Sequence, residues 1–139
     1  YDWVTSLPVP PDCRNYPEFV RWLSSAATEF DFAIAPLDMR QKFNRSKSSL
    51  KALEASGLGL PCLVSAGVVF DNTAEQLSEC IAVRNSDGEW FHEVDNVIQR
   101  IEETSSLRNA IKSEVLEKFG LSQRESSFDD LLKTAFFDA

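Results

Sequence analysis

Basic residues gather in one short stretch of this chain, between positions 38 and 54. The stretch holds five cations and two carboxylates: Arg40, Lys42, Arg45, Lys47, Lys51, Asp38 and Glu54. It therefore carries a charge of +3, whereas the other residues, nine basic and 20 acidic, carry −11. A positive island in an acidic chain favours a small anion as its ligand, and a solvated helix face with chance cations is the alternative interpretation.

A helix expected over residues 46–56 would align three of these side chains. Lys47, Lys51 and Glu54 are spaced i, i+4 and i+7, so they would share one face. The two lysines would hold a diphosphate, and the carboxylate would accept hydrogen bonds from a sugar diol, as in dinucleotide-binding folds. The pattern predicts a nucleotide-sugar site. An ordinary surface salt bridge between Glu54 and either lysine is the alternative.

The other side of that helix is expected to face the core through Leu50 and Leu53, and Gly57 is expected to end the helix. Core packing is also the expectation for the three tryptophans, including Trp90, because their neighbours are apolar. These assignments leave the polar stripe as the surface available to a ligand.

Apolar runs alternate with segments of helical periodicity along the chain. Strands are predicted at residues 3–8, 32–37, 61–65 and 80–84, and helices at 17–29, 46–56, from 86–89 onward, at 107–116 and at 128–136. This alternation predicts an α/β fold, a Rossmann-like parallel sheet with flanking helices. Ligands of such sheets bind at the carboxyl ends of the strands, and the basic stretch begins just after the second predicted strand.

Length and composition limit the kinds of protein this can be. The chain has 139 residues, 43% of them apolar, and no run approaches the roughly 20 apolar residues of a transmembrane helix. A net charge of −8 excludes nucleic-acid binding through the overall field. Cys13, Cys62, Cys80 and His92 are too scattered for a zinc site. Cys62 and Cys80 lie in apolar runs and are expected to be buried, which indicates a reduced, cytoplasmic chain without metal or disulfide.

Four segments that include the basic stretch are ordered and spaced as in a known family. These are residues 30–37, 43–48, 50–54 and 59–65, and together they resemble the donor half of GT-B glycosyltransferases. The similarity is closest to the bacterial group of surface-polysaccharide and O-antigen assembly (family 1/4-like), and it continues more weakly through residues 86–90 and 107–108. The resemblance implies that residues 1–139 are part of the C-terminal, donor-binding Rossmann-like domain of a longer, truncated enzyme.

The resemblance also implies roles for individual residues. Glu54 would bind the ribose and the basic residues the diphosphate, which gives six nucleotide-sugar-binding residues: Asn44, Arg45, Lys47, Ser48, Lys51 and Glu54. No metal and no cofactor besides the donor nucleotide sugar is implied. Many retaining members carry an acidic residue where this chain has Ser46, so neither the donor sugar nor the stereochemistry follows. Catalytic groups of the absent acceptor half are not assigned, and the isolated chain is expected to be inactive.

The expected partners follow from the charge of the chain and from the resemblance. The donor binds here, a glycan or lipid-linked acceptor binds through the missing half, and nucleic acid does not bind. If the first strands of the sheet are missing, an exposed edge favours pairing with a second copy, and the resemblance allows peripheral membrane association of the full-length enzyme. A non-catalytic Rossmann-like binding or interaction module remains the alternative function.

Overall fold

The described residues form two compact units, divided between Phe30 and Asp31. The structure is a computed structural model that describes residues 5–120 and 122. The helix predicted at 128–136 lies outside the described residues, as do residues 3 and 4 of the first predicted strand. Residues 5–8 form no strand, so that prediction is wrong for them. Pro8, followed by Pro10 and Pro11, lacks the amide hydrogen that a strand ladder needs.

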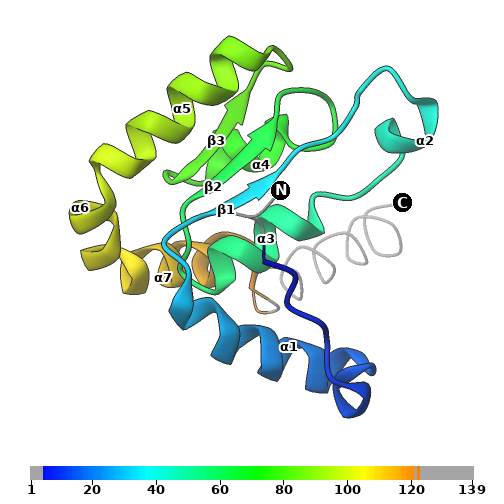
Figure 1. Ribbon diagram of the computed structural model, residues 1–139, viewed down its shortest axis with the longest axis vertical. Helices are drawn as coiled ribbons and strands as arrows, with labels where there is room; N and C mark the ends of the chain where they lie inside the picture. Colours follow the sequence, from blue (N-terminus) through cyan, green and yellow to red (C-terminus); the bar gives the residue numbers. More distant parts are fainter. Residues whose placement is uncertain (1–4, 121, 123–139) are drawn as a thin grey trace, which may run out of the picture. The chain divides into compact units, whose positions relative to one another are not determined.

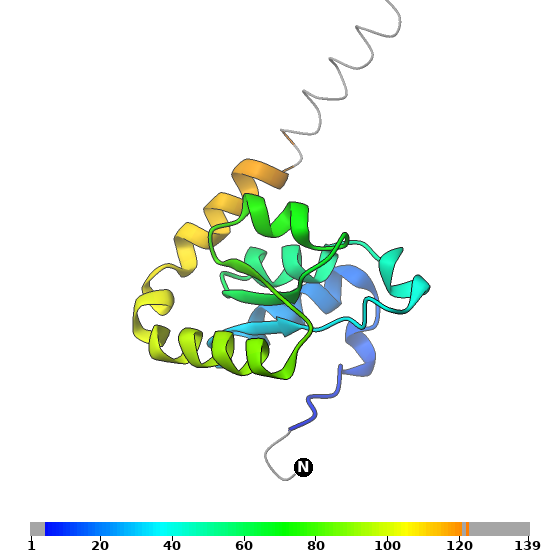
Figure 2. The ribbon, with the colours of Figure 1, turned by 90° about the horizontal axis from the view of Figure 1, so that it is seen from above.

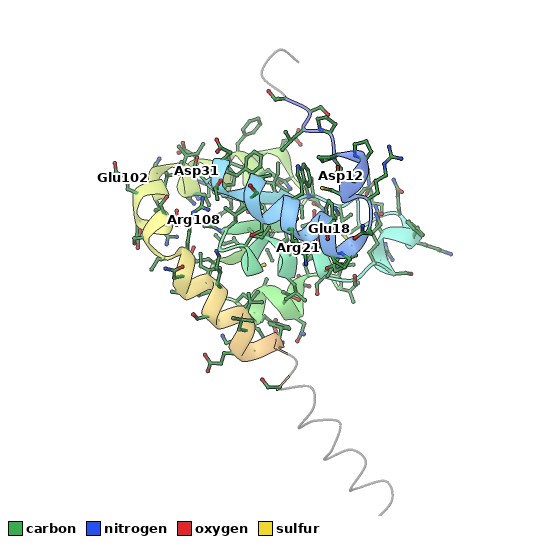
Figure 3. The ribbon with its side chains drawn as sticks, turned by 90° about the horizontal axis from the view of Figure 1, so that it is seen from below. Asp12, Glu18, Arg21, Asp31, Glu102 and Arg108 are labelled. Carbon is green, nitrogen blue, oxygen red and sulfur yellow. The ribbon has the colours of Figure 1, made fainter. Side chains whose placement is uncertain are left out.

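The first unit is helical. Its elements are η1 (Pro11–Cys13), α1 (Tyr16–Ala26) and η2 (Ala27–Glu29). The Asn15 side chain caps α1 by accepting a hydrogen bond from the Glu18 amide at 3.1 Å, and Pro17 occupies the first turn. Glu18 also forms an ion pair with Arg21 one turn later (Figure 3). The helix predicted over residues 17–29 is confirmed, with a 3₁₀ turn at its end.

The second unit contains a small parallel sheet. Its elements are β1 (Ala33–Ala35), α2 (Lys42–Arg45), α3 (Leu50–Gly57), β2 (Cys62–Ser65), α4 (Asp71–Gln76), β3 (Cys80–Val83), α5 (Asp87–Gln99), α6 (Ile101–Ser106) and α7 (Arg108–Phe119). The strands lie in the order β1-β2-β3, and both pairings are parallel (Figure 1). The predicted α/β fold with a parallel sheet and flanking helices is confirmed, and the open three-stranded sheet is compatible with a Rossmann-like architecture.

Helices cover both faces of this sheet (Figure 2). On one face, residues of α3, α4 and α7 pack against Cys62, Val64 and Cys80. On the other face, Val97 of α5 packs against Leu63 and Val83. The central strand β2 is buried along its whole length, as its unbroken apolar run predicts.

Cys62 and Cys80 are neighbours across the two strands, and both are buried as predicted. A hydrogen bond with the Cys80 thiol, together with burial, raises the pKa of Cys62. The same hydrogen bond lowers the pKa of Cys80, and the two side chains pack together inside the sheet.

The helix predicted over residues 46–56 begins four residues later than expected, at Leu50. Ser46, Ser48 and Ser49 precede it, and serine favours turns and caps over helix interiors. Lys47 therefore lies in the loop between α2 and α3. The prediction that Lys47 shares a helix face with Lys51 and Glu54 is wrong.

The inner side of α3 also differs from the prediction. Leu53 packs against the core as predicted, but the buried members of the core cluster on this helix are Ala52 and Ala55, and Leu50 is 46% exposed. Small side chains let α3 lie close to the strands, and Leu50, at the start of the helix, is left at the surface. Gly57 is the last residue of α3, and the left-handed backbone lies two residues later, at Gly59 (φ 79°).

Two later helix boundaries agree with the sequence. Ser86 caps α5 by accepting a hydrogen bond from the Glu89 amide at 3.4 Å, and α7 ends at Phe119, directly before Gly120. Across residues 5–120 and 122, none of the helices combines the length and the apolar character needed to cross a membrane.

Candidate functional site

The carboxyl ends of the three strands are joined by a hydrogen-bond network. At the end of β2, the Ser65 hydroxyl accepts a hydrogen bond from the Leu37 amide at 2.7 Å and donates one to Asn85 Oδ1 at 2.8 Å. Asn85 Nδ2 donates in turn to the Leu37 carbonyl at 3.0 Å. Leu37 follows β1 and Asn85 follows β3, so one fully buried serine fixes the loops that leave its two neighbouring strands.

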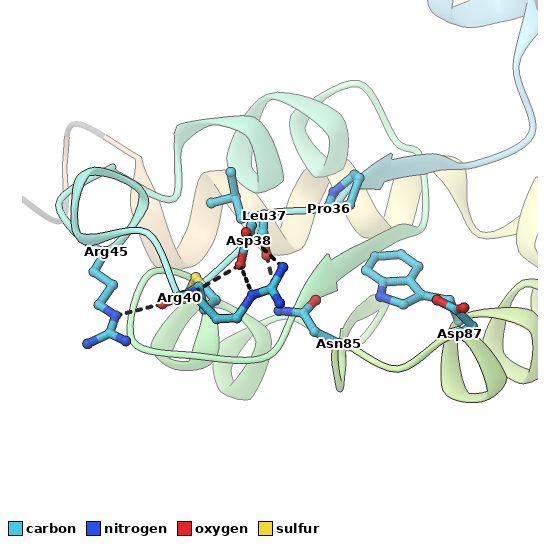
Figure 4. Close-up of a pocket in the computed structure, with 9 residues that line it drawn as sticks. Pro36, Leu37, Asp38, Arg40, Arg45, Asn85 and Asp87 are labelled. Carbon is cyan, nitrogen blue, oxygen red and sulfur yellow. Dashed lines mark hydrogen bonds and ion pairs between the residues drawn. The ribbon is translucent and has the colours of Figure 1, made fainter.

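These loops form an open cleft of about 670 Å³ at the same edge of the sheet (Figure 4). One wall is the segment 36–40, which follows β1, together with Arg45 of α2. The other wall consists of Asn85, Asp87 and Trp90, between the end of β3 and the first turn of α5. The cleft thus occupies the position where parallel α/β sheets bind their ligands.

Two arginines line the first wall. Arg40 is held by Asp38, to which its Nε and Nη2 donate at 2.9 and 3.1 Å (Figure 4). Hydrogen bonds from the Arg40 side chain and amide lower the pKa of Asp38 to about 2, so this carboxylate stays ionised at ordinary pH. Arg45 donates from Nε to the Met39 carbonyl at 2.6 Å. Within the described part of the chain, no hydrogen bond is formed by its two terminal nitrogens, which can therefore donate to a ligand.

Asn44 stabilises this wall through a hydrogen bond to its backbone. Although it is polar, Asn44 is only 8% exposed, and its Nδ2 donates to the Asp38 carbonyl at 3.0 Å. Its amide group therefore ties α2 to the loop that follows β1. Asn44 positions Asp38 and Arg45 and does not itself line the cleft.

The six residues expected from the sequence lie in different surroundings. Among the described residues that line the cleft, Arg45 is the one member of that set. Lys47 and Ser48 lie exposed in the loop after α2. Lys51 is exposed in the first turn of α3, and Glu54 is half-buried in the second.

The cleft also contains residues that sequence reasoning missed. Asn85 and Asp87 directly follow β3, and the carboxyl-end rule applied to that strand would have drawn attention to them. Trp90 was assigned to the core, and it does pack against the α5 face of the sheet, but it also lines the cleft. A side chain at a helix start can do both, because only one side of it faces the sheet.

The chemistry available here is recognition by hydrogen bonds and an aromatic surface. The cleft is lined by two guanidinium groups and by two carboxylates, Asp38 and Asp87, so its charges balance. Over residues 5–120 and 122, no three His, Cys, Asp or Glu side chains lie close enough together to hold a metal ion. Comparison of the chain with protein-family models, curated proteins and solved structures finds no match.

Proposed function

We propose that this chain binds the nucleotide-sugar donor of a GT-B glycosyltransferase, which transfers the sugar to a glycan or lipid-linked acceptor. The observation that carries the proposal is the cleft at the carboxyl ends of β1 and β3, into which the segment after β1 brings Arg45. Anionic ligands of parallel α/β sheets bind at this edge. The resemblance of residues 30–65 to donor-binding domains supports the same ligand.

The role proposed for Arg45 follows from its charge and its place in the cleft, and the roles of the other residues follow from the resemblance. The terminal nitrogens of Arg45 donate charge-assisted hydrogen bonds to the diphosphate, and Lys47 and Lys51 from the adjoining loop and helix add positive charge. Glu54 accepts hydrogen bonds from the ribose. As the sugar leaves, charge grows on the diphosphate, and the cations stabilise it in the transition state. The chain thus contributes donor binding and leaving-group stabilisation.

A non-catalytic binding module is the second candidate, and one observation favours it. Asp38 already neutralises Arg40, and Asp87 adds a further negative charge to the cleft. Such a balanced surface suits a neutral polar ligand better than a diphosphate, because the carboxylates repel phosphate oxygens. The two candidates therefore differ in whether the phosphates contribute to affinity.

Calorimetric titration with UDP, GDP, uridine and guanosine distinguishes the two candidates. Under the donor-binding proposal, one diphosphate binds much more tightly than its nucleoside, and Arg45→Gln weakens that binding by roughly tenfold, the loss expected for one charged hydrogen bond. The matched control is Lys42→Gln, a cation on the same helix that does not line the cleft, and it leaves the affinity unchanged.

Two outcomes would contradict the donor-binding proposal. One is a folded chain that binds neither diphosphate. The other is an Arg45→Gln variant with the affinity of the wild-type chain. A separate result, nucleoside binding that the phosphates do not improve, would favour the binding module. The isolated chain is expected to transfer no sugar, because transfer requires donor and acceptor to be held together.

A further inference from the structure

Two free cysteines lie side by side in the core of the sheet, away from the cleft. Cys62 is the first residue of β2 and Cys80 the first residue of β3, and the parallel register pairs the two. Both side chains belong to the core cluster on the face of the sheet that α3, α4 and α7 cover. A hydrogen bond joins the two thiols. The fold thus holds two reactive sulfur atoms in contact.

The spacing of the strands allows these thiols to form a disulfide within the existing sheet. Adjacent strands lie about 4.8 Å apart, and the Cα atoms of disulfide-linked cysteines lie about 4.4–6.8 Å apart. The remaining cysteine, Cys13, belongs to the other compact unit. Cys62 and Cys80 are therefore the pair that the sheet brings together.

A cavity gives a small molecule access to this pair. Although Cys80 is only 4% exposed, it lines an open cavity of about 250 Å³ between α4 and β3. The other lining residues are Asp71, Ala74, Glu75 and Ala82. Hydrogen peroxide fits this space easily, since a water molecule takes about 30 Å³ of liquid volume. The two carboxylates disfavour anionic oxidants such as oxidised glutathione, so a small neutral oxidant suits the cavity best.

We propose that Cys62 and Cys80 form a site of reversible oxidation by hydrogen peroxide, which ends in a disulfide between β2 and β3. In the first step the Cys80 thiolate attacks one peroxide oxygen and the O–O bond breaks, which leaves a sulfenic acid and a hydroxide that takes up the thiol proton. In the second step the Cys62 sulfur attacks the sulfenic sulfur, and the hydroxyl leaves as water with the Cys62 proton. Two thiols and one peroxide thus give one disulfide and two waters, and two electrons pass from sulfur to oxygen.

The order of the two steps follows from the surroundings of each thiol. Cys80 lines the cavity and Cys62 does not. The hydrogen bond between them lowers the pKa of Cys80 and raises the pKa of Cys62. Because the thiolate is the nucleophile, Cys80 reacts with peroxide and Cys62 resolves the product. An adjacent resolving cysteine is also typical of redox-sensing proteins.

This inference goes beyond donor binding and does not depend on it. Cys62 and Cys80 begin their strands, whereas the cleft lies at the carboxyl ends. The test below requires no nucleotide, so its failure and the failure of the donor-binding proposal are distinguishable.

Thiol mapping of the full chain tests the proposal. The folded chain is treated with a small molar excess of hydrogen peroxide, quenched with catalase, and unfolded in urea with iodoacetamide present. All three cysteines should be alkylated before treatment and Cys13 alone after it. Burial and the neighbouring Asp12 raise the pKa of Cys13, so this thiol reacts slowly and serves as the internal control. Proteolysis should yield one peptide pair linked through Cys62 and Cys80, and dithiothreitol should restore both thiols.

Two variants test the separate steps. Cys13→Ser should form the same link as the wild-type chain. Cys62→Ala, once circular dichroism shows that it is folded, should stop at the sulfenic acid of Cys80, which dimedone traps. The wild-type mapping decides the proposal by itself if that core substitution prevents folding.

Three results would overturn the proposal. The first is a peroxide-treated wild-type chain in which all three cysteines are still alkylated. The second is a link that includes Cys13 or joins two chains. The third is a folded Cys62→Ala variant whose Cys80 carries no dimedone after treatment with peroxide.

Discussion

Replacement of Ser65 by alanine should loosen the edge of the sheet that forms the cleft. The Ser65 hydroxyl is fully buried, and it links the Leu37 amide to the Asn85 side chain. Ser65→Ala removes both hydrogen bonds at once but hardly changes the packing, because only one oxygen atom is lost. The consequence for stability can therefore be estimated from the two groups left behind.

The Leu37 amide and the Asn85 side chain do not lose the same amount of stabilising free energy. Leu37 is half-buried, so its amide cannot fully regain a water partner, and a buried donor left unsatisfied costs about 1–3 kcal/mol. Asn85 is exposed, and its Oδ1 can accept from water instead. We expect Ser65→Ala to lower the free energy of unfolding by about 2 kcal/mol, and Asn85→Ala by about 1 kcal/mol. Because the two share one bond, the double variant should lose about 0.5–1 kcal/mol less than the sum.

Urea unfolding at equilibrium, followed by circular dichroism, measures these differences. The dependence on urea should be the same in all variants, so that shifts of the midpoint report stability alone. Ser48→Ala, at an exposed serine in the loop after α2, is the control and should stay within about 0.5 kcal/mol of the wild-type chain. A smaller loss for Ser65→Ala than for Asn85→Ala, or strictly additive losses, would refute the assignment of Ser65 as the link between the strand ends.

Three further predictions concern backbone conformation, pH and the ligand. Gly59→Ala should destabilise the chain by about 1–3 kcal/mol, because φ is 79° and the new Cβ would lie 2.7 Å from the Arg108 carbonyl oxygen. Gly57→Ala should stabilise the chain by about 0.5–1 kcal/mol, because its new Cβ would lie in open space on α3. Thermal unfolding of both variants measures the two changes. Burial raises the pKa of Glu114, but hydrogen bonds from Lys118 and Ser78 outweigh it and hold the pKa below its usual value. The resulting stability is present above about pH 4.5 and is lost as the pH falls through the lowered pKa. In urea titrations, the wild-type chain should therefore lose more stability than Glu114→Gln between pH 7 and pH 3. Equal losses of stability in the two chains would contradict this. If the donor-binding proposal holds, Glu54→Gln should weaken UDP or GDP binding by roughly ten- to a hundredfold in calorimetry, and Lys47→Ala should weaken diphosphates more than nucleosides; unaltered affinities would remove both residues from the site.

The sequence by itself determined the sheet and the starts and ends of several helices. The apolar run at residues 61–65 predicts a strand buried on both faces, and β2 is buried throughout. Asn15 and Ser86 each stand directly before a helical segment and cap it, because a side-chain oxygen three residues before an amide can reach it without help from the rest of the fold. The two buried cysteines follow from their apolar neighbours in the same way.

Local serines also show where pattern alone fails. The leucine spacing of residues 50 and 53 predicts a helix from residue 46 with both leucines inward. The helix begins only after Ser49, Leu53 packs against the core but Leu50 does not, and the buried residues of α3 are Ala52, Ala55 and Ser56. How closely a helix can approach a sheet decides which of its sides is inside. That distance depends on strands elsewhere in the chain, so hydrophobicity alone does not give it.

Only the tertiary structure decided the composition of the cleft. Asn85 lies 48 residues beyond Leu37 in the chain, yet parallel register brings the two loops within hydrogen-bond distance. Register likewise places Trp90 and Asp87 opposite Arg45, and the folding of the loop pairs Arg40 with Asp38. The sequence identifies cations near a strand end because the residues of one segment, and their order along it, can be read without knowledge of the fold. Which groups neutralise or join them is decided by contacts between distant segments, and those contacts exist only when the strands pair.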